Sequence, residues 1–417
     1  MAVIALFDKS FLQSLNVDES VWFDHFFMPV VCPIFYVETL ADLAKEQRSD
    51  RTPEAVVRAI AQKFPEKRGS PCINHTPLAV QNLLGAHVPL DGRIPRPSGR
   101  HVQGGGKKGV VFESSEEEEA FNRWQREEFR EVERMFAAKW RAELNAMDLS
   151  QIPAALRNSG FDPKQCKTFE DAREIASQTI GNYAKAFEVL RFATLFLGVP
   201  NVRHQEVIKR WKAAGQPSLP SFAPYAAFVL EVEIFFHVTI AANLISSGRN
   251  SNRNDIAYLF YLPFCQAFVS GDKLHRTTAS LFLRSDQGFV WGPDLKADLR
   301  RINEHFLTLP EEVREQGLFK FAGRPPELPD SVVRGLWKRH LRSCALAEPD
   351  MTDKLSQEGR AKLVANLKAF TKGKTIPARE VPADREAIKM MAIEHRVRKR
   401  KGSWWQLPKD LPDQPEE

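Results

Sequence analysis

Two short apolar runs, each followed by an aspartate, constrain the fold of this chain more than any other feature. Residues 2–7 read AVIALF and lead into Asp8, and residues 266–270 read QAFVS and lead towards Asp272. A short continuous apolar run is typical of a strand buried on both faces of a parallel sheet. Functional groups gather at the carboxyl ends of such strands. If the two strands are neighbours, we expect the two aspartates to lie side by side.

Further strands and helices alternate with these two runs. Residues 26–31 form another apolar run, and GFVW from Gly288 predicts a strand late in the chain. Pro33 suits the first turn of a helix. The positions that follow it place apolar residues at helical spacing, as one buried face requires. The pattern predicts an α/β protein with a parallel-sheet core.

The domain organisation is predicted from changes in composition. Residues 65–112 are rich in proline and glycine and predict irregular structure with a short hairpin. Helical patterns then dominate to about residue 213 and again beyond residue 294. We therefore expect a core formed by residues 1–48 and 225–295. A long, mainly α-helical insertion (49–224) would split it, and a helical C-terminal extension with a basic tail (296–417) would follow.

Bulk properties set the expected compartment and the type of partner. The formal net charge of +6 is a mild basic excess that suits a polyanion. The five cysteines lack the short spacings of zinc sites, and their odd, dispersed count fits a reducing compartment. The N-terminal segment lacks the features of a secretory signal. We expect a cytoplasmic protein.

One long apolar segment, residues 225–245, could be confused with a membrane span. It contains Glu231, Glu233 and His237, which are costly in hydrocarbon. The segment therefore predicts a buried helix, and no membrane partner is expected. Glu233 and His237 have the i, i+4 spacing of some zinc ligands, but no third ligand is near, so a satisfied buried pair is the better interpretation.

Two more acids accompany the aspartates at the ends of predicted elements. Glu38 lies early in the helix after Pro33, and Asp255 begins a helix after a polar loop. Carboxylates that converge remain ionised only when a cation offsets their repulsion. Asp8, Glu38, Asp255 and Asp272 therefore form a candidate site for Mg²⁺ or Mn²⁺.

The segments that carry these acids resemble the motifs of PIN-like (PilT N-terminus) domain nucleases. IALFDKSFLQSL is similar to the opening strand and turn, with Asp8 and Ser10. PIFYVETLADL is similar to the second motif, with Glu38. RNDIAYLFYLPFCQAFVSGDKLH is similar to the third and fourth acidic motifs, with Asp255 and Asp272. The resemblance implies a PIN-like core that the insertion splits.

The resemblance also implies an activity, which is metal-dependent hydrolysis of RNA phosphodiester bonds by an endoribonuclease. The four acids would bind Mg²⁺ or Mn²⁺, and Ser10 and Lys273 would contact a metal-bound water or the phosphate. Many family members are toxins or defence nucleases, which implies an inhibitory or regulatory protein partner. Two alternatives stay open: a structure-directed DNase of the same fold, and a non-catalytic RNA-binding scaffold.

Each acid also has a simpler interpretation. An aspartate after a strand is common in turns, and an aspartate at a helix start is a common N-cap. Asp42 lies one turn after Glu38 and could replace it as the second acid. Asp286 precedes the GFVW strand and is interpreted as a turn residue rather than an outer carboxylate.

Basic residues occur in two further segments. Lys107 and Lys108 lie in GGGKKG, which is interpreted either as a flexible loop or as a loop that contacts the substrate. Arg398 and Lys399 lie in HRVRKRKGSWW near the C-terminus. Basic residues beside tryptophans fit phosphate contact with base stacking, and the alternative is a solvated tail.

Overall fold

The computed structural model describes residues 2–45, 51–97, 99–158, 162–341, 356–380 and 391–411. Its centre is a five-stranded sheet in which all neighbouring strands are parallel. The strands stand in the order β3 (Ser70–Pro71), β2 (Phe27–Val31), β1 (Val3–Phe7), β6 (Ala267–Ser270) and β7 (Gly288–Trp291). The predicted α/β class and the parallel sheet are confirmed.

Strand β1 is the point at which the order of the sheet reverses. The chain continues from β1 to β2 and β3 on one side, and β6 and β7 extend the sheet on the other side. Ala5 pairs with Ala267 and Phe7 pairs with Val269. The strands that precede Asp8 and Asp272 are therefore neighbours. The carboxyl edge between them is the position where open α/β sheets bind ligands.

Helices pack against this sheet and bury its apolar side chains. Pro33 stands at the start of its helix, as predicted. The ring centre of Phe7 lies 5.6 Å from that of Phe23 and 5.0 Å from that of Phe35. These contacts join β1 to the helix that precedes β2 in the chain and to the helix that follows it. The helices that pack around the sheet include α1 (Lys9–Ser14), α2 (Val17–Phe26), α3 (Pro33–Leu40), α16 (Gly292–Leu307) and α19 (Val332–His340).

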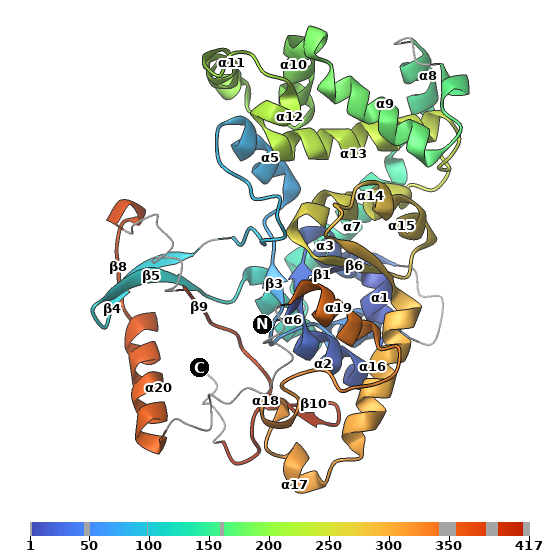
Figure 1. Cartoon of the computed structure of the whole chain (residues 1–417). Helices are drawn as coiled ribbons and strands as arrows, with labels where there is room; N and C mark the ends of the chain where they lie inside the picture. The colour runs from blue at the N-terminus through green and yellow to red at the C-terminus, as the bar shows by residue number, and fades with distance from the viewer. Residues whose placement is uncertain are drawn as a thin grey trace.

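A helical layer lies beyond the carboxyl edge of the sheet (Figure 1). Its central helix, α13 (Pro224–Ala241), packs against several others. In the described part of the chain, α13 alone is long and apolar enough to cross a membrane, and 78% of it is buried inside the protein. The prediction of a buried helix is confirmed. The helices packed on α13 in this layer are α5 (His75–Leu83), α8 (Ile152–Asn158), α9 (Phe169–Gly181), α10 (Ala186–Phe196) and α12 (Leu219–Phe222). Helix α11 (His204–Ala213) belongs to the same layer (Figure 1).

A second, smaller sheet stands to one side of the core (Figure 1). The predicted hairpin forms its centre, with β4 (Arg100–Gly104) antiparallel to β5 (Lys107–Phe112). The C-terminal region adds β8 (Lys374–Thr375) and β9 (Met391–Ile393), and α20 (Gln357–Thr371) packs on β4. The remaining helices are α4 (Pro53–Ala61), α6 (Glu116–Trp124), α7 (Glu131–Ala146), α14 (Asn252–Ala257), α15 (Lys273–Thr278), α17 (Glu311–Arg314) and α18 (Leu318–Phe321).

The segments predicted as separate units share structure with one another. Strand β3 belongs to the central sheet although it lies within residues 49–224, which the sequence assigned to the insertion. The C-terminal extension also contributes to the core, because α16 packs on α2 and α19 contacts β1. The four described cysteines are buried and free, and Cys344 lies outside the described residues.

The basic C-terminal segment is docked on the core, so its interpretation as a solvated tail is wrong. Lys401 is buried and donates to the Phe64 carbonyl over 2.6 Å, and Arg398 forms an ion pair with Glu66 at 2.6 Å. Trp404 is fully buried. In this position its indole cannot stack on a base. The segment forms β10 (Arg400–Lys401) and β11 (Trp404–Trp405).

Candidate active site

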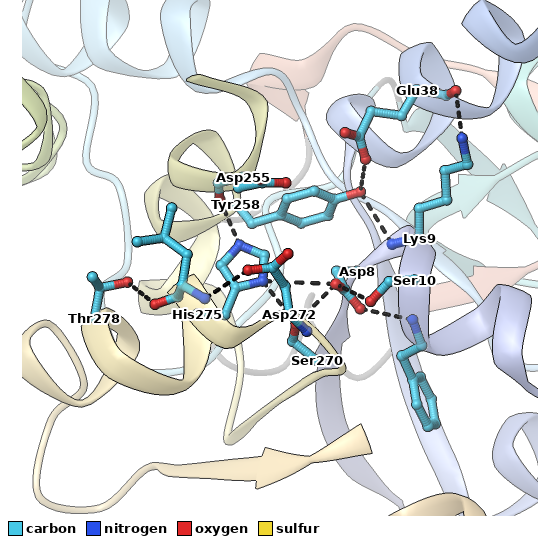
Figure 2. A network of polar contacts seen from close by, with 12 residues as sticks. Asp8, Lys9, Ser10, Glu38, Asp255, Tyr258, Ser270, Asp272, His275 and Thr278 are labelled. Carbon is cyan, nitrogen blue, oxygen red and sulfur yellow. Dashed lines mark hydrogen bonds and ion pairs between the residues drawn. The ribbon is translucent and has the colours of Figure 1, made fainter. Parts of the chain in front are cut away.

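Asp8 directly follows β1, and its two carboxylate oxygens have different partners. Oδ1 accepts a hydrogen bond from the Phe11 amide at 2.9 Å and so caps α1. Oδ2 accepts from the Ser10 hydroxyl at 2.6 Å and from the Ser270 hydroxyl at 2.8 Å (Figure 2). One oxygen therefore caps a helix, and the other faces the hydroxyls of Ser10 and Ser270.

Asp272 repeats this division at the end of β6. Its Oδ1 accepts from the Leu274 amide at 2.6 Å and caps α15. Its own amide donates to the Ser270 hydroxyl at 2.9 Å. Its Oδ2 lies 4.0 Å from a guanidinium nitrogen of Arg249. Ser270 thus links the two aspartates across the junction of β1 and β6.

His275 is buried between the Asp255 carbonyl and Ser270 (Figure 2). Its Nε2 lies 2.6 Å from the Asp255 carbonyl oxygen, which can only accept. Its Nδ1 lies 2.7 Å from the Ser270 hydroxyl. Because Ser270 has a single proton and gives it to Asp8, Nδ1 must donate as well, so both ring nitrogens carry protons.

The electrostatics agree with an imidazolium at this position. Burial lowers the pKa of His275, but the neighbouring Asp8 and the Asp255 carbonyl outweigh burial and raise it above its ordinary value. Burial likewise raises the pKa of Asp8, and His275, Ser10 and the Phe11 amide together lower it below the ordinary value. Asp8 is therefore held as a carboxylate in a nearly dry environment.

Asp255 is the least satisfied of the four acids. It lies in the first turn of α14, and its Oδ2 is buried without a hydrogen-bond partner among the described residues. The nearest positive group to this oxygen is Arg249, at 3.6 Å. Burial, with repulsion from Asp272 and Glu38, raises the pKa of Asp255 to about 7. An orphaned buried carboxylate oxygen of this kind is suited to a cation.

Glu38 joins the group through Tyr258. The Tyr258 hydroxyl donates to Glu38 Oε2 at 2.7 Å and accepts from the Lys9 amide at 3.3 Å. Burial raises the pKa of Glu38, and the charge of Asp8 adds to this effect, while Lys9 and Tyr258 oppose it. Glu38 therefore lies within electrostatic range of the strand-end acid.

Asp42, the alternative second acid, is occupied by other partners. Its oxygens form ion pairs with Lys9 and Lys45, each at 2.5 Å. Both lysines hold it at the end of α3, so its negative charge is already offset. The contacts favour Glu38 over Asp42 as the second acid of the site.

The fit of this site to a metal ion rests on its donor chemistry. Carboxylate oxygens are the ligands that Mg²⁺ and Mn²⁺ prefer, and the orphaned Oδ2 of Asp255 lacks a counter-charge in direct contact. Within the described ranges, however, no three Asp, Glu, His or Cys side chains converge closely enough to hold a metal as they stand. The acids are joined through Ser270, Tyr258, His275 and Arg249 instead.

The remaining predicted residues are distributed over three regions. Ser10 and Lys273 are exposed beside Asp8 and Asp272. Lys107 and Lys108 are exposed on β5 of the smaller sheet, away from the acids (Figure 1). Arg398 and Lys399 lie in the docked C-terminal segment, where Lys399 donates to the Leu411 carbonyl at 2.6 Å.

The docked segment lies at the edge of the central sheet opposite to the acids. Arg398 pairs with Glu66, just before β3 begins, and Lys401 lies close enough to Asp24, just before β2, to shift its pKa. These are the amino ends of parallel strands. A contact of Arg398 and Lys399 with RNA stays a prediction, and it concerns a different face from the acids. Asp286 also precedes its strand, β7, and pairs with Arg284.

Glu233 and His237 do not pair with each other in the way that the sequence suggested. The partner of Glu233 is Arg253 from α14. His237 lies against the rings of Phe196 and Phe236, and burial lowers its pKa to about 4. A buried acid with an arginine partner leaves the zinc interpretation without support.

Sequence reasoning missed four residues of the site: Arg249, Tyr258, Ser270 and His275. All four lie in or beside the segment that carries Asp255 and Asp272. Ser270 and His275 could have been found from their positions relative to the predicted elements. Ser270 ends a strand, and His275 follows Asp272 within the first turn of α15.

No protein-family model, curated protein or solved structure matches this chain.

Proposed function

We propose that this protein is a metal-dependent phosphodiester hydrolase with a PIN-like core, and that it acts as an endoribonuclease. The observation that carries the proposal is the meeting of Asp8 and Ser270 at the carboxyl edge of β1 and β6. Asp272 and Asp255 stand beside this junction, and Glu38 reaches it through Tyr258. Four acids from separate elements are thus gathered at the switch point of a parallel sheet.

The four acids would hold Mg²⁺ or Mn²⁺, and three of them already have support that orients them. Ser10 and Ser270 fix Asp8, the cap of α15 fixes Asp272, and Tyr258 fixes Glu38. A cation bound there supplies activation of a water and neutralisation of charge on the phosphate. Hydrolysis by water would leave a 5′-phosphate and a 3′-hydroxyl.

Nucleic acid is the substrate class that the surroundings favour. Lys273 and Arg276 are exposed on α15 beside Asp272, and the Arg276 guanidinium lies 5.0 Å from the Trp291 ring centre. Arg249 adds a third cation, 3.6 Å from Asp255 Oδ2 and 4.0 Å from Asp272 Oδ2. These cations suit a phosphate backbone, and the net charge of +6 agrees with a polyanionic substrate.

The experiment that tests the proposal is cleavage of end-labelled RNA and DNA of matched sequence. With Mn²⁺ present, we expect the RNA to be cut internally and the new ends to carry 5′-phosphates. EDTA should stop the reaction, and added Mn²⁺ should restore it. Cleavage of DNA alone would support the DNase alternative. Tight RNA binding with no cleavage of either substrate would contradict the enzyme and support a scaffold.

A further inference from the structure

Arg249 is the cation nearest to the least satisfied oxygen of the site. It lies in the polar loop between α13 and α14, and its Nη2 stands 3.6 Å from Asp255 Oδ2 and 4.0 Å from Asp272 Oδ2. No other basic side chain in the described residues forms an ion pair with either aspartate. The guanidinium therefore lies where two carboxylates repel each other.

The contact is loose. Both distances exceed the usual length of a charge-assisted hydrogen bond, which is about 2.7–2.9 Å. The Arg249 side chain is 61% exposed, so water screens the attraction. The attraction between Arg249 and the two carboxylates is therefore weak, and a divalent cation can displace the guanidinium from them.

The loop is held in place by hydrogen bonds that do not involve the Arg249 guanidinium. The Asn250 side-chain amide donates to the Leu144 carbonyl at 2.9 Å, and the Asn252 side-chain amide donates to the Ser246 carbonyl at 3.1 Å. Arg249 Nε donates to the Ser251 hydroxyl at 2.9 Å. A change of rotamer at Arg249 would break this one hydrogen bond to Ser251, and the loop would keep its other hydrogen bonds.

We propose that Arg249 is an exchangeable counter-ion: it offsets Asp255 and Asp272 until a divalent cation binds, and it then binds the phosphate oxygens of the RNA backbone. This inference rests on the proposed function. A divalent cation and a guanidinium would compete for the same two carboxylates, so binding of the cation releases the arginine beside the substrate. The planar guanidinium can donate two parallel hydrogen bonds to one phosphate.

The test measures cation affinity and substrate affinity separately in Arg249→Gln. Mn²⁺ binding is followed by electron paramagnetic resonance without RNA, and KM is measured with an RNA oligonucleotide at saturating Mn²⁺. We expect Mn²⁺ to bind roughly fivefold more tightly, because a competing charge worth up to about 1 kcal/mol is gone. We expect KM to rise about 10- to 100-fold, as loss of charge-assisted hydrogen bonds predicts.

Two further variants make the pattern specific. Arg249→Lys keeps the charge but loses the planar fork, so Mn²⁺ affinity should stay near the wild-type value while KM still rises. Arg203→Gln removes another partly exposed arginine that pairs with Glu206 in the helical layer, and it should change neither quantity.

The outcomes separate this inference from the proposed function. Wild-type protein that binds no Mn²⁺ would overturn the proposed function and this inference with it. Wild-type protein that binds Mn²⁺ and cleaves RNA would leave the function intact. In that case, Arg249→Gln with unchanged or weaker Mn²⁺ binding, or with unchanged KM, would overturn the role of Arg249 alone.

Discussion

The Ser270 hydroxyl donates to an Asp8 carboxylate oxygen over 2.8 Å, although the two residues are 262 positions apart. The contact forms because β1 and β6 are parallel neighbours and both end at the same edge. Ser270 also meets Asp272 and His275. One buried hydroxyl thus connects the two ends of the core and sets the geometry of the acids.

Asp255 should make the stability of the metal-free protein depend on pH. Its folded-state pKa of about 7 lies above the ordinary value of 3.8, so the folded state binds more protons between these values. Stability should therefore fall as the pH rises from about 4 to 7. In EDTA, Asp255→Asn should be more stable than wild type at pH 8, by on the order of 2–4 kcal/mol, and nearly equal to it at pH 4. Urea unfolding at pH 4 and pH 8 measures the free energy of unfolding of each variant, and Asp286→Asn serves as the exposed control. An equal difference between Asp255→Asn and wild type at the two pH values would contradict the raised pKa of Asp255.

Glu38 and Asp42 should respond differently to neutralisation. Glu38→Gln should weaken Mn²⁺ binding about 10- to 100-fold, as loss of a metal ligand or its support does. Asp42→Asn leaves Lys9 without its ion-pair partner, so it should lower the free energy of unfolding and change Mn²⁺ affinity little. Titration of Mn²⁺ with both variants decides between the two acids. The reverse pattern would make Asp42 the second acid.

His275 should act as a positioning residue for the acids. His275→Gln removes the donor to Ser270 while keeping a polar side chain, so the support of Asp8 and of the Asp255 backbone is lost. Mn²⁺ affinity should fall about 10- to 100-fold. At saturating Mn²⁺, KM for RNA should stay near the wild-type value. A loss of stability with unchanged Mn²⁺ affinity would leave His275 a purely structural role.

The docked C-terminal segment should contribute to stability through Lys401. This buried ammonium faces Glu66 and Asp24, and Lys401→Met would leave both carboxylates without it. The free energy of unfolding should fall by about 3–5 kcal/mol, the usual cost of breaking a buried pair. Arg400→Met, at the exposed neighbouring position, should cost much less. Equal unfolding midpoints in urea for Lys401→Met and wild type would refute this role.

The local sequence pattern was sufficient to predict three strands of the central sheet. The apolar runs before Asp8 and Asp272 and the strand from Gly288 are all present, because buried parallel strands read as continuous apolar segments. Strand β3 was missed. It is only two residues long, and pairing with β2 rather than its own composition makes it a strand.

The site was predicted in part for the same reason. Strand ends carry a local signal, which is why Asp8 and Asp272 could be placed together. The partners of each acid depend on tertiary contacts, so the sequence could not reveal that Tyr258 supports Glu38 or that Arg249 faces Asp255. The interpretation of the basic C-terminal segment as a solvated tail was wrong for a related reason. A charged pattern does not disclose a buried counter-charge such as Glu66.

The central claim is tested most directly by cleavage of labelled RNA with Asp8→Asn and Asp272→Asn. Each substitution removes one negative charge from the acid group and keeps the shape of the side chain. Asp286→Asn, which alters an exposed acid at the amino end of β7, is the matched control. With Mn²⁺, we expect both site variants to lose at least about 100-fold in cleavage rate while they stay folded, and the control to cleave like wild type. Wild-type rates in both Asp8→Asn and Asp272→Asn would contradict the assignment.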